Sequence, residues 1–233
     1  MLDLKHTLGD FEDSLRNTRK EVLTMASVAQ QNLGSAVTGL LNRNEDLCND
    51  AIAEDEEVNQ LERAIDQRGM EILIRFNPVA TDLRMVVAAM KISANLERIS
   101  DQAENVARRA RKVLKKDAVQ EVNLIGPIYE LAANLLKDAV KSFAEDDANL
   151  ALTLFERDQV LDKLHRKAIK KYTTLMEEDI ENLRTYLNLI FIVRCLERVG
   201  DHSVNIGEET VYINQGRSIR HIGPSALNDE DED

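Results

Sequence analysis

The sequence predicts an all-α protein made of two tandem three-helix bundles that are related by internal duplication. One segment occurs twice, first as Leu96-Glu97-Arg98-Ile99-Ser100-Asp101 and, one hundred positions later, as Leu196-Glu197-Arg198-Val199-Gly200-Asp201. Around both copies, apolar residues recur every three or four positions, which is the spacing of a helix that packs against other helices. Only three prolines, nine glycines and 4% aromatic residues occur in 233 residues, a composition that favours amphipathic helices over a β-sandwich or barrel.

The first bundle is expected to occupy residues 1–116 as three helices joined by short turns. A three-or-four spacing of apolar residues over 5–41 predicts the first helix. A second helix is predicted over 46–76, where Asn77-Pro78 stops it, and a third over 82–116, with Thr81 as its N-cap.

Residues 117–127 are expected to connect the bundles, and residues 128–216 to form the second one. Its first two helices match those of the first bundle at an offset of 103, as Leu136 matches Leu33, whereas the third helices match at an offset of 100. Three residues are therefore lost in the turn before the third helix. Each half is long enough to bury a core of its own. The helical pattern then stops, and we expect the acidic segment 217–233 to be disordered.

Charge and composition exclude several classes of function. A net charge of −12, with no aromatic stacking surface, argues against a nucleic-acid-binding protein. No apolar run approaches the roughly 18 residues of a membrane span; the most apolar segment, 187–196, is shorter and contains Arg194. Cys48 and Cys195 lie in helical patterns without a second cysteine nearby, and no signal peptide is evident, so we expect buried thiols in a reducing, cytoplasmic compartment.

Side chains able to bind metal recur one helical turn apart in both halves. Two carboxylates at positions i and i+4 of an exposed helix repel by about 0.2–0.5 kcal/mol, and a divalent cation removes that cost by binding both. The heptad places the acids of each third helix opposite the apolar seam. The candidate metal ligands are Asp55, Asn59, Glu62, Glu97 and Asp101 in the first half and Asp158, Asp162, His165, Glu197 and Asp201 in the second.

An alternative interpretation is that these acids form ordinary ion pairs with arginines on the same helix, each worth little on a surface. The pairs suggested by sequence spacing are Arg98–Asp101, Arg194–Glu197, Arg198–Asp201 and Glu104–Arg108. The basic cluster over 108–116 has two interpretations as well, as a solvated helix end or as a docking surface for an acidic partner.

The paired motifs resemble those of the PhoU family of phosphate-signalling regulators, whose helices carry Pro-Val-Ala-x-Asp-Leu-Arg followed by Leu-Glu-Arg-Ile-Gly-Asp-His-Ala-Glu-Asn-Ile. The resemblance covers about residues 8–215. The matching segments here are Pro78-Val79-Ala80-Thr81-Asp82-Leu83-Arg84, Leu96-Glu97-Arg98-Ile99-Ser100-Asp101-Gln102-Ala103-Glu104-Asn105-Val106 and Leu196-Glu197-Arg198-Val199-Gly200-Asp201-His202-Ser203-Val204-Asn205-Ile206.

This resemblance implies two three-helix bundles, a cytoplasmic location, a homodimer, and a negative regulator that links the phosphate ABC transporter to a phosphate-sensing histidine kinase. It also implies metal clusters, of manganese, zinc, magnesium or iron, held by pairs such as Glu97 with Asp101 and Glu197 with Asp201. Asn59 departs from the acid expected in the first half, so we expect metal chiefly in the second.

Two rival functions remain open. A di-metal helical-bundle oxidase or metal-storage protein would carry Glu-x-x-His motifs on two helices, and Asp162-x-x-His165 is the nearest case in this sequence. A purely structural coiled-coil scaffold would bind no metal and form a rod. We find no set of residues suited to hydrolysis or group transfer and expect no enzymatic activity.

Overall fold

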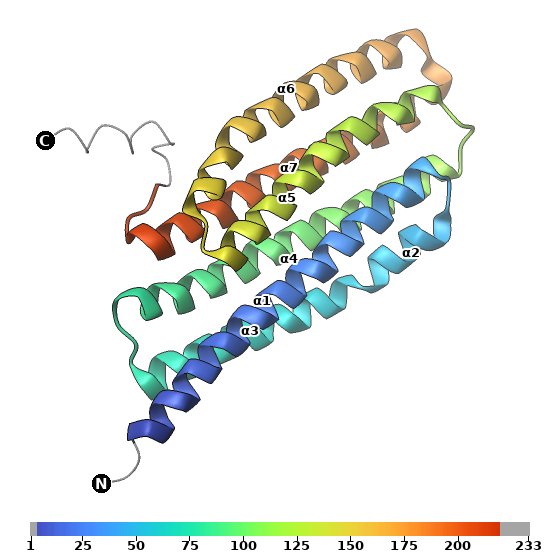
Figure 1. Cartoon of the computed structure of the whole chain (residues 1–233). Coiled ribbons are helices and arrows are strands. Elements are labelled where there is room, and N and C mark those ends of the chain that lie inside the picture. Colours follow the sequence, from blue (N-terminus) through green and yellow to red (C-terminus); the bar gives the residue numbers. More distant parts are fainter. Residues whose placement is uncertain (1–3, 220–233) are drawn as a thin grey trace, which may run out of the picture.

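Residues 4–219, which the computed structural model describes, form seven α-helices and two short 3₁₀ helices (Figure 1). The first half contains α1 (Leu4–Leu41), α2 (Glu45–Ala53), α3 (Asp55–Phe76) and α4 (Ala80–Leu114). The second half contains η1 (Gln120–Leu124), α5 (Ile125–Glu145), α6 (Ala148–Glu178), η2 (Ile180–Asn182) and α7 (Leu183–Gln215). This arrangement confirms the predicted duplicated all-α fold.

The predicted second helix is interrupted at Glu54, so that prediction was wrong in detail. The N–H of Glu57 donates to the carbonyl of Glu54, three residues back, and this tighter turn separates α2 from α3. The start of α2 follows the expected chemistry, because the Asn44 side chain accepts from the N–H groups of Asp46 and Leu47. The corresponding α6 is continuous.

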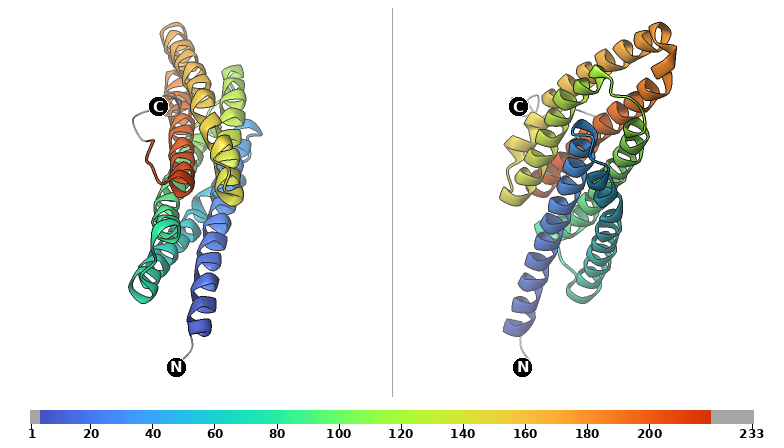
Figure 2. Two further views of the ribbon diagram at one scale, coloured as in Figure 1. Left: turned by 60° about the vertical axis from the view of Figure 1, so that its left-hand side comes forward. Right: turned by 90° about the vertical axis from the view of Figure 1, so that its right-hand side faces the viewer.

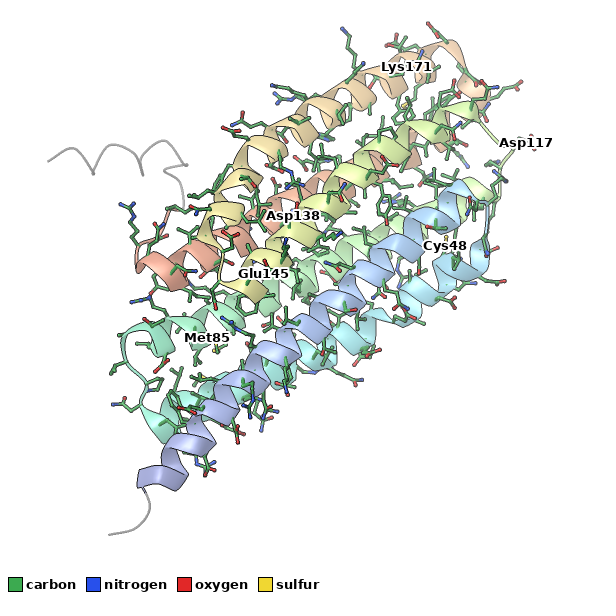
Figure 3. The ribbon with its side chains drawn as sticks, viewed as in Figure 1. Cys48, Met85, Asp117, Asp138, Glu145 and Lys171 are labelled. Atoms are coloured by element: carbon green, nitrogen blue, oxygen red, sulfur yellow. The ribbon has the colours of Figure 1, made fainter. Side chains whose placement is uncertain are left out.

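Two further boundaries differ from the prediction. Thr81 is not an N-cap: α4 begins at Ala80, and the Thr81 hydroxyl accepts a hydrogen bond from Arg84 Nη2 at 3.0 Å. The predicted connection is shorter than 117–127, because α5 begins at Ile125 with Pro127 in its first turn, where a helix needs no N–H donor. Asp117 marks the turn between the halves in Figure 3.

The three residues lost between the repeats correspond to 77–79. At the offset of 103, Phe76, the last residue of α3, matches Asp179. At the offset of 100, Ala80, the first residue of α4, matches Ile180, so residues 77–79 have no counterpart. The left-handed backbone of Asn77 (φ 48°) ends α3, and Pro78 follows it.

The two halves lie side by side and are offset along their length (Figure 2). They meet chiefly where α4 runs antiparallel to α7, the most extensive helix pair in the described chain. A single hydrophobic cluster extends from Val22 on α1 to Ile213 on α7 and includes Leu96 and Leu196. The halves therefore share one core, although the sequence suggested that each would bury its own.

Polar contacts also fix α1 and α6 against α5 and its turn. Arg19 Nη1 on α1 donates to Asp146 Oδ2 in the α5–α6 turn at 2.8 Å, and so joins the two halves. Arg157 Nη1 on α6 donates to Asp138 Oδ2 on α5 at 2.6 Å, and Figure 3 shows Asp138 on this helix.

The predicted disorder of 217–233 was wrong for its first residues. Gly216, with φ of 71°, ends α7, and the chain turns so that Ile219 packs against Ala151 and Val211 with 2% of its surface exposed. The acidic run 229–233 lies outside the described residues.

The cysteines differ from each other in their surroundings. Cys48 is fully buried, as predicted, whereas Cys195 is only half-buried. Burial raises the pKa of both thiols to about 11. None of the helices within 4–219 is both long and apolar enough to span a bilayer.

Candidate functional site

The acids of α4 and α7 flank the apolar seam and do not face away from it, which corrects the heptad prediction. Leu96 is fully buried in the seam, while the side chains of Glu97 and Asp101 beside it are 17% and 35% exposed. They face α3 in the first half. Their counterparts on α7 share electrostatic neighbours with α6 in the second.

In the first half, hydrogen bonds already satisfy the central aspartate. Asp55 Oδ1 accepts from Ser100 Oγ on α4 at 2.7 Å, and Asp55 Oδ2 accepts from Asn59 Nδ2 at 3.1 Å. Asn59, which replaces the second acid of the α3 pair, thus serves as a donor within the protein.

The α4 acids of the first half are partly neutralised by one arginine. Arg98 Nε lies 3.3 Å from Glu97 Oε2, and Arg98 Nη1 lies 3.2 Å from Asp101 Oδ2. The pKa of Glu62 is raised by burial and then by Asp66, a neighbour that lies outside the repeated acid motifs. The ion-pair interpretation therefore describes the α4 acids of this half.

In the second half, the carboxylates lie close enough to raise one another's pKa. Burial, followed by Asp201, Asp162 and Glu197, raises the pKa of Asp158 to about 7. Burial, followed by Glu197 and Asp162, raises the pKa of Asp201 to about 6 against the opposing effect of Arg198, even though the Asp201 side chain remains exposed at the rim. The fold thus concentrates negative charge between α6 and α7.

Two buried atoms of this second cluster have no hydrogen-bond partner within the described chain: Asp158 Oδ1 and His165 Nε2. The cause at Asp158 is a single difference between the repeats. Ser100, which donates to Asp55, is replaced by Gly200, and a Cβ at Gly200 would lie 2.6 Å from Asp158 Oδ1. The α7 backbone therefore approaches Asp158 without offering a donor.

The ion pairs expected in the second half do not form among residues 9–219, whose side chains the structure describes. Arg194 and Arg198 act electrostatically on Glu197 without forming an ion pair with it, whereas Arg166 lies 3.6 Å from Asp162 in an exposed position. His202 lies elsewhere, because its Nδ1 is 3.0 Å from Asn95 Oδ1 on α4.

The donor set of the second cluster suits a divalent cation in its chemistry, with oxygen ligands and one imidazole. Its two unpartnered buried atoms, Asp158 Oδ1 and His165 Nε2, are positioned to accept from or ligate something beyond the chain. Within the described residues, however, no three His, Cys, Asp or Glu side chains converge closely enough to hold an ion. Binding by three of these side chains would therefore require them to rotate inward.

The raised pKa values predict that the metal-free protein loses stability as the pH rises. An acid whose folded pKa exceeds its ordinary value of 3.8 stabilises the fold fully below about pH 4 and loses that effect up to about pH 6–7. The lowered pKa of His165 acts oppositely, but only as the pH falls through about 6.5. We expect Asp158→Asn to remove on the order of 1–2 kcal/mol of the difference between pH 5 and pH 8, after allowing for solvent screening.

Urea unfolding at both pH values measures this effect, with Asp55→Asn as the matched control from the first half. A pH dependence that is equal in the wild type and in Asp158→Asn would show that Asp158 ionises normally.

Comparison with known proteins identifies relatives along nearly the whole chain. The PhoU domain profile matches twice, over residues 22–110 and 126–210. The phosphate-specific transport system accessory protein PhoU homolog of Pseudomonas putida is 34% identical over 94% of this chain and 86% of its own length. The phosphate-specific transport system accessory protein PhoU of Escherichia coli is 33% identical over 96% of this chain and 92% of its own.

Solved structures agree with the fold. The crystal structure of PhoU from Pseudomonas aeruginosa superimposes with a TM-score of 0.86 at 32% identity, covering 89% of this chain and all of that one. The phosphate transport system regulatory protein PhoU from Streptococcus pneumoniae gives 0.83 at 22% identity, covering 89% of this chain and 98% of its own, which shows the shared fold alone.

Proposed function

Because the chain belongs to the PhoU family, we propose that it is a phosphate-transport accessory protein that negatively regulates phosphate uptake and phosphate-starvation signalling in the cytoplasm. The observation that carries this proposal is the match of both repeats to the PhoU domain, in order, over residues 22–110 and 126–210. The regulator acts by contact, as an adaptor between the phosphate ABC transporter and a sensor histidine kinase, and catalyses no reaction.

The basic end of α4 is a smaller docking candidate than the sequence suggested. Arg108 Nη2 pairs with Glu104 at 2.6 Å and Arg111 Nε pairs with Glu45 at 3.1 Å, so both arginines are engaged within the protein. The lysines at the same helix end, Lys112, Lys115 and Lys116, line a cavity with Arg184 of α7. We place the adaptor's contact with an acidic partner surface at these four cations.

Metal binding is the second element of the proposal. The α6–α7 cluster supplies carboxylates, among them Asp158 with its unpartnered oxygen, and His165, and a bound cation would neutralise a face that is otherwise strongly negative. Neutralising it changes the electrostatic complementarity available to a partner. A di-metal oxidase is less well supported, because His165 is the single histidine that the structure places among these acids.

We also propose a homodimer. Large apolar side chains are exposed around the end of α3 and the turn into α4, namely Met70, Ile74 and Val79, with exposed fractions of 50%, 80% and 70%. A second copy that covers them would remove this apolar surface from water.

Deleting the gene should derepress phosphate-starvation genes while phosphate is plentiful, because a negative adaptor would no longer hold the kinase in its repressing state. The measurement is a transcriptional reporter for a starvation gene at high phosphate. The effect should disappear when the kinase or the transporter is removed as well, which is the control for pathway position. Normal repression in the deletion strain would refute the regulatory role.

A further inference from the structure

A second polar site lies between α4 and α7, beside the acid cluster of the second half. It is a cavity of about 260 Å³ whose positive charge comes from Arg109 on α4 and from Arg194 and Arg198 on α7. Gln102 and Asn105 add amide groups, and Phe191 and Cys195 complete the lining.

The acids Glu197 and Asp201 are electrostatic neighbours of Arg198, but neither of them lines this cavity. No acidic side chain lines it, and Arg109, Arg194 and Arg198 form no ion pair within residues 9–219. On a chain of net charge −12, such a concentration of unpaired arginines is unexpected. Arg109 is also held in place: its Cζ lies 4.2 Å from the centroid of the Phe191 ring, and its Nη1 donates to Asn188 Oδ1 at 3.4 Å.

The duplication provides an internal comparison. Residues one hundred positions apart form an equivalent position on the other side of the α4–α7 pair. There Glu209 corresponds to Arg109 and Lys91 corresponds to Phe191, and Lys91 Nζ pairs with Glu209 at 3.2 Å. Ala94 stands there for Arg194.

The remaining polar groups of that equivalent position also satisfy one another. His202 Nδ1 and Asn205 Nδ2 lie 3.0 and 3.2 Å from Asn95 Oδ1. Arg98, the counterpart of Arg198, pairs with Glu97 and Asp101. At one of the two equivalent positions the charged groups therefore pair with one another. At the other, three arginines line a cavity without forming an ion pair.

We propose that the cavity lined by Arg109, Arg194 and Arg198 binds a small phosphoryl oxyanion, either orthophosphate or diphosphate. Guanidinium groups bind such anions through paired N–H donors, and Gln102 and Asn105 contribute further donors. The cavity is smaller than the roughly 300–1,000 Å³ typical of pockets for larger ligands. Arg109 already covers one face of Phe191, so the site offers anion donors in place of a stacking surface for a base.

A neighbouring cavity strengthens the positive field at this site. Lys112, Lys115, Lys116 and Arg184 line it, and Asn188, which accepts from Arg109, belongs to the same lining. Cations in a concave surface raise the local concentration of anions and their association rate. The oxyanion site does not rest on the proposed regulatory function, since its test uses the purified chain alone.

The direct test is calorimetric titration of metal-free full-length protein, prepared by dialysis against a chelator and then against chloride buffer, with sodium phosphate and with diphosphate. We expect saturable binding of one anion per chain, weakened at least tenfold by Arg194→Gln and by Arg109→Gln. Arg98→Gln, at the self-neutralised equivalent position, should change the affinity by less than twofold. Circular dichroism checks that each variant remains folded.

Cys195 provides a second readout inside the cavity. Saturating anion should slow its alkylation severalfold, measured by mass spectrometry, with fully buried Cys48 as the internal reference. This protection should be absent in Arg194→Gln.

The proposal would be overturned if phosphate bound to the wild type and to Arg194→Gln with equal affinity. It would also be overturned if chloride and sulfate, added at the same ionic strength, weakened phosphate binding equally. Tighter binding of an acidic peptide than of diphosphate would be the third contrary result. The last outcome would identify a protein-docking surface. Failure here leaves the regulatory proposal standing, because the reporter experiment does not depend on this cavity.

Discussion

Replacing Glu197 and Asp201 together by Ala should abolish stoichiometric Mn²⁺ binding by the metal-free protein, whereas replacing Glu97 and Asp101 should leave most of it. The second pair lies beside Asp158 Oδ1, a buried oxygen without a partner among the described residues. The first pair is engaged by Arg98 at 3.3 and 3.2 Å, so a cation there must first displace an arginine. Calorimetric titration of both double variants, with zinc and iron(II) in parallel, measures the difference.

The same experiment should show proton release on binding. Because the pKa of Asp158 is about 7 and that of Asp201 about 6, part of the cluster is protonated near neutral pH and must lose protons to ligate a cation. Affinity should therefore rise between pH 6 and pH 8, and the measured heat should depend on the ionisation enthalpy of the buffer.

Equal loss of binding in both double variants would place the ligands elsewhere. If the acids of α7 served only as surface charges, Glu197→Ala with Asp201→Ala would leave binding unchanged and shift stability by no more than about 0.2–1 kcal/mol per pair.

Periodicity predicted the fold well because a helix that packs on helices must repeat its apolar residues at three or four positions. The errors fall where backbone geometry decides. The break at Glu54 depends on one hydrogen bond, in which the N–H of Glu57 donates to the carbonyl three residues back. The spacing of apolar residues around Glu54 does not indicate that bond. Ile219 is one apolar residue beyond a helix-ending glycine, too little for a periodic signal, although it is fully packed against Val211.

The candidate site was predictable as a set of residues but not as a set of contacts. The spacing located both acid clusters. It could not show that Ser100 satisfies Asp55 while Gly200 leaves Asp158 without a donor, because that contrast depends on how closely neighbouring helices approach. Likewise, the sequence spacing of Arg98 and Arg198 is the same, yet Arg98 pairs with acids and Arg198 lines a cavity.

The feature that the repeat concealed is the shared core. A duplication suggests two independent units, but buried residues of both halves belong to one cluster, and α4 and α7 form its centre. A unit that buries its apolar surface against its own duplicate loses that burial when the duplicate is removed. Because burial of apolar surface is the main term that stabilises a folded domain, losing this interface destabilises the half that remains.

We therefore expect the full-length protein to unfold in one cooperative transition, and residues 1–116 alone to be unfolded or self-associated. One unit of this length should absorb about 160 kcal/mol near 60 °C, and two independent halves about 80 kcal/mol each, as estimated from about 0.7 kcal/mol per residue. Scanning calorimetry distinguishes these cases, because the van 't Hoff enthalpy equals the calorimetric one only for a single unit.

Cutting the exposed connection near Asp117 should leave the two fragments associated, since the α4–α7 interface persists without the link. A van 't Hoff enthalpy near half the calorimetric value, together with a monomeric and cooperatively folded 1–116 fragment, would instead show that each half is stable by itself.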